Sequence, residues 1–173
     1  RWNPQTQKPE VILKFQGAAG EPYRDCWDQL RLDGTRWSIY LDTLYSRINE
    51  FAKNDPNCFP PCPPCDQPAL FYEIKISGCV KLVSKPAIVT HDGRIIEWAY
   101  GLEYCDSDNY CLYTYACCSD WNTSPPETHI WLVSVQEYGT PACSTTEPQV
   151  PPPGKDWNEP WETECFAKPC RNQ

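Results

Sequence analysis

The stretch Leu70-Phe-Tyr-Glu-Ile-Lys-Ile-Ser77 opens the part of the chain that decides the fold. It is rich in β-branched and aromatic residues, a composition that favours strands. Further segments of the same kind follow up to Tyr138, and the turn at Asp92-Gly93 suits a hairpin. The predicted strands are Leu70–Ser77, Cys79–Ser84, Ala87–Thr90, Arg94–Glu103, Tyr110–Cys118 and His129–Tyr138. Together they predict a mainly β fold, an antiparallel meander that forms one sheet or a sandwich.

Residues 36–53 carry a different pattern, in which apolar residues recur every three or four positions and polar residues fill the other face. This spacing predicts one amphipathic helix over 36–53, with Thr35 as its N-cap. Asn54 and Pro56 supply the stop. The alternative is a hairpin that turns at Asp33, but the helical pattern extends over more residues and is favoured.

Twelve cysteines, an even number, indicate a disulfide framework formed in an oxidising compartment. They are Cys26, Cys58, Cys62, Cys65, Cys79, Cys105, Cys111, Cys117, Cys118, Cys143, Cys165 and Cys170. The adjacent Cys117 and Cys118 are expected to bond to different partners, because a disulfide between neighbours is strained. A metal cluster or redox pair at Cys58, Cys62 and Cys65 is the alternative. Structural disulfides are favoured there, because prolines surround these cysteines and the two histidines of the chain lie far apart.

The chain divides by composition into a body at 22–143 and two arms at 1–21 and 144–173. Within the body, 57–68 is a linker rich in proline and cysteine, which excludes helix and central strand. The N-terminal arm contains a short predicted strand, and the C-terminal arm is rich in proline and tryptophan. The predicted subunit-contact residues of the arms are Val11, Ile12, Leu13, Phe15, Trp157 and Trp161. A neighbouring copy is one surface that could bury them, and packing within the same chain is the other.

Charge and hydropathy exclude two classes of function. Lys+Arg 15 against Asp+Glu 23 gives a net charge of −8, which disfavours a nucleic-acid partner. No stretch approaches the roughly 20 apolar residues of a membrane-spanning helix. The chain has no methionine and begins at Arg1, so we expect a processed, secreted protein whose leader has been removed.

These features predict a secreted, non-enzymatic structural protein, a subunit of an extracellular fibre, pilus-like filament or surface coat that binds copies of itself through its arms. The alternative is a monomeric module that binds carbohydrate or a cell-surface or matrix protein. Trp98, Tyr100, Trp121 and Trp131 would then form a sugar-stacking platform. The third hypothesis for the function is a protease-inhibitor-like protein or an enzyme. No pattern identifies a catalytic residue, a metal ligand or a cofactor site, so none is predicted.

Asn122-Thr-Ser124 matches the acceptor signature for N-glycosylation. It falls on a predicted loop, where an attached glycan would meet no packed side chains. Asn122 is therefore a predicted glycosylation site.

Overall fold

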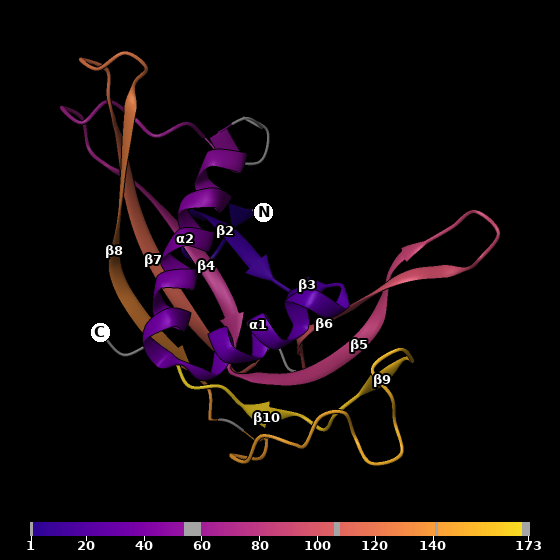
Figure 1. Cartoon of the computed structure of the whole chain (residues 1–173). Coiled ribbons are helices and arrows are strands. Elements are labelled where there is room, and N and C mark those ends of the chain that lie inside the picture. The colour runs from indigo at the N-terminus through magenta and orange to yellow at the C-terminus, as the bar shows by residue number, and fades with distance from the viewer. Residues whose placement is uncertain (1, 54–59, 106–107, 141, 171–173) are drawn as a thin grey trace.

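A computed structural model of the chain describes residues 2–53, 60–105, 108–140 and 142–170. Within them lie two helices and ten strands (Figure 1). The N-terminal elements are β1 (Trp2–Asn3), β2 (Lys8–Leu13), β3 (Phe15–Ala19), α1 (Glu21–Leu32) and α2 (Gly34–Lys53). The later strands are β4 (Leu70–Ser77), β5 (Cys79–Val89), β6 (Ile95–Tyr104), β7 (Tyr110–Asp120), β8 (Glu127–Tyr138), β9 (Trp161–Glu162) and β10 (Phe166–Ala167). The prediction of a mainly β fold is confirmed.

The strands form two sheets. The first sheet has the order β1-β2-β4-β7-β8, and the second has the order β10-β5-β6-β3, with β9 also paired to β5. The single meander predicted from the sequence is wrong, because the consecutive strands β4 and β5 belong to different sheets. The pairing of β2 with β4 is parallel, whereas the other strand pairs are antiparallel. The predicted strands Cys79–Ser84 and Ala87–Thr90 are one strand, β5, with an irregularity after Pro86.

The chain passes from the first sheet to the second at Lys14 and at Gly78. A side chain at position 78 would not fit, because a Cβ there would lie 2.6 Å from Oδ1 of Asn109. The Gly78 N–H instead donates to the Asn109 carbonyl at 2.8 Å. Glycine therefore permits the close approach that lets the backbone change sheets.

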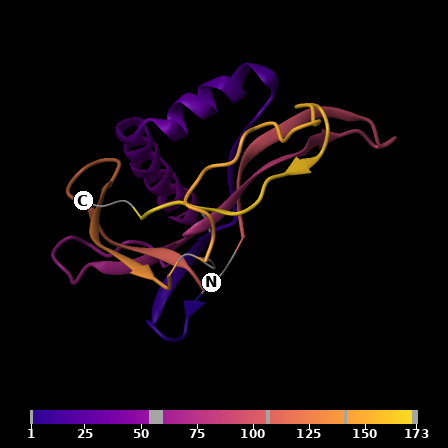
Figure 2. The ribbon, with the colours of Figure 1, turned by 90° about the horizontal axis from the view of Figure 1, so that it is seen from below.

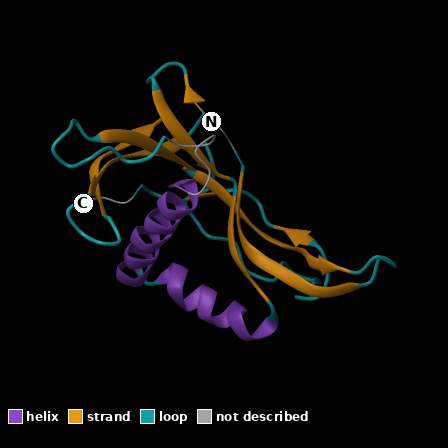
Figure 3. Ribbon diagram, turned by 90° about the horizontal axis from the view of Figure 1, so that it is seen from above, coloured by secondary structure: helices purple, strands orange, loops and turns teal. Residues whose placement is uncertain are grey.

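Both helices lie on the same side of the strands (Figure 3). α2 covers the range in which the sequence predicts a helix, but its first turn is capped differently. The Asp33 carboxylate accepts the N–H groups of Thr35 and Arg36 at 3.0 Å, so Asp33 replaces the predicted N-cap Thr35. The predicted stop at Asn54 and Pro56 lies outside the described residues. α1 was not predicted from the sequence. No helix in the described ranges is long and apolar enough to cross a membrane.

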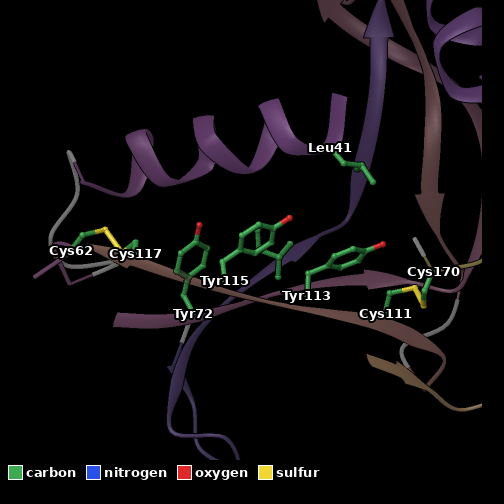
Figure 4. Close-up of a cluster of buried hydrophobic side chains, with 9 residues drawn as sticks. Leu41, Cys62, Tyr72, Cys111, Tyr113, Tyr115, Cys117 and Cys170 are labelled. Atoms are coloured by element: carbon green, nitrogen blue, oxygen red, sulfur yellow. A yellow bond between two sulfur atoms is a disulfide. The ribbon is translucent and has the colours of Figure 1, made fainter. Parts of the chain in front are cut away.

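The core lies between the helices and the two sheets and has two clusters. Figure 4 shows Tyr72, Tyr113 and Tyr115 pointing from the first sheet toward α2. A second cluster forms around Leu82 and Leu102 of the second sheet. Two side chains of α2, Trp37 and Tyr40, pack against both clusters, stacked 5.0 Å apart. One helix therefore ties the two sheets together by apolar contact.

The arms do not lack a partner within their own chain, which corrects the premise of arm exchange. Val11, Ile12 and Leu13 of β2 pair with β4, and Phe15 of β3 pairs with β6. At the other end, Trp161 lies in the core of the second sheet and Trp157 packs against that core. The C-terminal segment runs alongside the β5–β6 hairpin (Figure 2). Trp161 is buried and the other anchors are half-buried within their own chain, because each arm completes a sheet or covers a face of the body.

Ten of the predicted disulfide cysteines are bonded. The pairs are Cys62–Cys117, Cys65–Cys118, Cys79–Cys143, Cys105–Cys165 and Cys111–Cys170. The neighbours Cys117 and Cys118 bond to different partners, as predicted. Cys26 is exposed on α1 and forms no disulfide with a described cysteine, so the structure does not support its predicted disulfide. Cys58 lies outside the described residues, as do residues 57–59 of the linker.

Candidate ligand-binding groove

A groove of about 600 Å³ opens over the second sheet. One wall consists of Arg24 on α1 and of Gly20, the residue before α1. Trp157 of the C-terminal segment forms the opposite wall. Residues Ile95–Trp98 and Tyr100 of β6 form its length. We call this hollow the aromatic groove, because three of its lining side chains are Trp98, Tyr100 and Trp157.

Gly20 fixes the first wall. Its φ of 87° belongs to the left-handed region, and a Cβ there would lie 2.6 Å from a carboxylate oxygen of Glu97. The Gly20 N–H donates to the Trp98 carbonyl at 3.1 Å, the last bond between the β3 end and β6. The chain then turns into α1, which carries Arg24 over the sheet. A glycine is therefore required where the strand ends and the helix begins.

The opposite wall is held by β9 and its loop. Trp161 pairs with Ser84, and the Ser84 hydroxyl donates to the Trp157 carbonyl at 3.1 Å. The Trp157 ring meets the rings of Tyr100 and Trp161 edge to face, at centroid distances of 5.0 and 5.6 Å. This arrangement fixes the Trp157 ring before any ligand arrives.

Tyr100 forms the floor of the aromatic groove and is buried. Its hydroxyl donates to the Asp28 carboxylate at 3.1 Å and accepts a hydrogen bond from the Arg31 guanidinium at 3.4 Å. Burial raises the pKa of Tyr100 above its ordinary value of 10.0, so the phenol stays neutral in the folded protein. The floor therefore presents an uncharged ring whose polar end is already bonded.

Two charged groups in the aromatic groove form no ion pair with any residue that the structure describes. The Arg24 guanidinium lies 4.3 Å from the centre of the Trp157 ring, a cation–π contact, and its buried Nε has no hydrogen-bond partner. Neither Arg24 nor Glu97 forms an ion pair or side-chain hydrogen bond with any described residue. A carboxylate that only accepts and a guanidinium that only donates are thus both available in one hollow.

The four aromatic residues proposed from the sequence as one platform are divided by the fold. Trp98 and Tyr100 lie two residues apart on β6 and line the aromatic groove. Trp121 and Trp131 lie exposed in the β7–β8 region of the first sheet, away from it. The groove instead gains Trp157, which was predicted as a subunit contact. Arg24 and Glu97 were missed, because no sequence pattern marks an unpaired charge.

Neither a metal nor a modification is placed in this groove. Among the described residues, no three His, Cys, Asp or Glu side chains are grouped to hold a metal ion. Asn122 is exposed in the loop between β7 and β8, and its Nδ2 donates to the Asp120 carboxylate at 2.9 Å. Its glycosylation stays a prediction.

No family model, no curated protein and no solved structure matches the chain. The chemistry of the aromatic groove therefore has to be argued from its own residues.

Proposed function

We propose that this chain is an extracellular, non-enzymatic binding module that holds a carbohydrate in the aromatic groove. The observation that carries the proposal is the meeting of half-buried aromatic side chains with charged groups that form no ion pair with a described residue. Ligand sites commonly join apolar walls to a few convergent polar groups in this way.

Sugar hydroxyls suit this set of groups because each one both donates and accepts hydrogen bonds. Glu97 can accept only, while Arg24 and the indole N–H groups of Trp98 and Trp157 can donate only. Within the described part of the chain, neither indole N–H donates a hydrogen bond. The C–H face of a sugar ring is apolar and would lie against the Trp98 ring, which excludes water from both surfaces.

Five disulfides support an extracellular setting, because such bonds persist in oxidising compartments. They also favour a site formed in advance. Two of them, Cys79–Cys143 and Cys105–Cys165, hold the C-terminal segment that carries Trp157 to the second sheet. A wall fixed in this way loses little conformational freedom when a ligand binds.

The test is calorimetric titration with a panel of soluble neutral oligosaccharides. We expect at least one to bind, and Trp98→Ala to weaken its binding by about tenfold or more through loss of the stacked ring. Trp121→Ala is the matched control, because Trp121 is 64% exposed and lies outside the groove. Glu97→Gln should weaken binding while leaving the fold intact. Equal affinity in Trp98→Ala and Trp121→Ala would contradict the proposal.

A second candidate function is assembly into an extracellular fibre or coat, and one observation favours it. β8 is 12 residues long and lies at the edge of the first sheet, with Trp131 exposed on it. A long edge strand can pair with a strand of another copy. Light scattering should then show mass rising with concentration, and Trp131→Lys should reduce the rise while Trp121→Lys does not. A constant monomer mass would eliminate this candidate.

A further inference from the structure

The β5–β6 hairpin extends beyond the strands that flank it and projects from the body (Figure 1). On one side β3 reaches only as far as Ala99 of β6, and on the other β9 pairs only with Val83 and Ser84 of β5. The outer part of the hairpin is therefore a ribbon of two strands. Such a ribbon has too little sheet around it to bury its own side chains.

This ribbon exposes large aliphatic side chains. Ile88, Val89, Ile95 and Ile96 are between 41 and 66% exposed. Val89 lies opposite Ile95, so these two side chains share one face of the ribbon, while Ile88 lies opposite Glu97. Contiguous exposed apolar surface of this kind marks an interaction site more often than isolated residues do.

The apolar surface runs into the aromatic groove without a break. Ile95 and Ile96 line the same hollow as Trp98, Arg24 and Glu97. The groove thus joins aromatic and polar side chains to the aliphatic side chains of Ile95 and Ile96. A free sugar would form hydrogen bonds with the polar groups but would leave the aliphatic side chains exposed to water.

We propose that the ligand of the aromatic groove is an amphiphile, a sugar that carries a hydrocarbon chain. This inference rests on the proposed function. The sugar occupies the end formed by Trp98, Arg24 and Glu97, and the hydrocarbon lies along Ile95 and Ile96 toward the hairpin turn. The ligand class is therefore that of glycolipids and alkyl glycosides.

The hairpin turn argues against tip-first insertion into a lipid bilayer. Beyond the aliphatic residues lie Asp92 and Arg94, joined by an ion pair at 2.8 Å, and both are exposed. Insertion by the tip would strip water from this ion pair, which is costly. A single hydrocarbon chain lying along the shaft of the hairpin leaves the turn in water.

The experiment compares methyl, hexyl and octyl β-maltoside by calorimetry, each below its micelle concentration. Every methylene that is fully buried should raise the affinity by up to about fourfold, so affinity should rise from methyl to hexyl to octyl. Ile96→Ser should abolish that rise. Val133→Ser is the matched control, since Val133 is a comparably exposed aliphatic residue on β8, and it should retain the rise.

Three outcomes would overturn the inference. Equal affinity for the three maltosides means that the aliphatic end contacts nothing, and the carbohydrate proposal survives. Octan-1-ol binding as tightly as octyl maltoside means that the sugar contributes nothing. Failure of every maltoside removes the amphiphile, while failure of the carbohydrate proposal is the separate finding that no oligosaccharide of the panel binds.

Discussion

The outer face of the first sheet and the aromatic groove differ in whether their charged side chains have partners. Glu73 on β4 is 1% exposed, yet Lys8 lies 3.1 Å from one carboxylate oxygen and the Thr6 hydroxyl donates to the other at 2.8 Å. Arg24 and Glu97 in the groove have no such partners among the described residues. A buried charge that is satisfied stabilises structure, whereas available charges in a hollow favour a ligand.

The two regions also differ in how much of their aliphatic side chains is exposed. Ile74 on β4 is 0% exposed and lies in the core under α2, whereas Ile96 on β6 is 66% exposed at the rim of the groove. The same residue type therefore serves stability in one sheet and remains available for binding in the other. Substitutions that compare the two regions can test this division.

The largest effect is expected in the core. Ile74→Ala should lower the free energy of unfolding by about 2–5 kcal/mol, because it removes a buried side chain and leaves a cavity. Ile96→Ala should change it by less than about 0.5 kcal/mol, as exposed sites do. Urea denaturation of both variants measures the difference. A loss at Ile96 equal to that at Ile74 would show that the hairpin packs on the body.

The next effect is a loss of stability at alkaline pH. Burial raises the pKa of the Tyr72 and Tyr100 hydroxyls above the ordinary value of 10.0. The folded state keeps both neutral while the unfolded chain ionises them, so this stability is present below pH 10 and is lost above it. At one pH unit above 10 the loss is up to about 1.4 kcal/mol for each tyrosine, or about 3 kcal/mol together.

Urea denaturation at a series of pH values from 8 to 11 measures this loss. Burial raises the pKa of Tyr104 and Tyr40 in the same direction, so Tyr72→Phe removes one of several contributing phenols and should make the decline shallower without abolishing it. Stability that stays flat up to pH 11 in the unsubstituted protein would mean that the phenol groups ionise without unfolding. Tyr100 lies on the groove floor, so ionisation of Tyr100 only at high pH would show that the floor is buried.

The smallest expected effect is the difference in stability lost when an ion-paired and a non-ion-paired charged residue are replaced. Lys8→Met should lower the free energy of unfolding by about 2 kcal/mol, because Glu73 loses a charged hydrogen bond while its contact with Thr6 remains. Arg24→Met should cost less than about 1 kcal/mol, the value of its cation–π contact with Trp157. Thermal unfolding of the two variants compares them. If Arg24→Met proves the more destabilising, Arg24 holds the groove wall in place and is not a ligand group.

The sequence predicted the strands of the body well and their partners poorly. The strand predicted at Leu70–Ser77 matches β4, and the β-branched and aromatic composition of β7 and β8 is a local signal. The parallel pairing of β2 with β4 joins segments about 60 residues apart, and no local pattern encodes it. For the same reason the arms could not be assigned to their own sheets.

The groove was partly predictable. Trp98 and Tyr100 fall on one face of a strand because they are two residues apart, which a period of two makes visible. Trp157 reaches them only because β9 pairs with β5 and Ser84 holds its carbonyl. Arg24 depends on where α1 begins, and Gly20 sets that start through its close contact with Glu97.

By itself, the sequence determined a mainly β, disulfide-bonded and acidic chain, because strand propensity, cysteine number and charge are properties of single residues and near neighbours. Only the tertiary structure decided which cysteines pair, where the arms lie and which charges remain unsatisfied. Those outcomes depend on contacts between distant segments, and the free energy of a distant contact is defined only once the chain has folded.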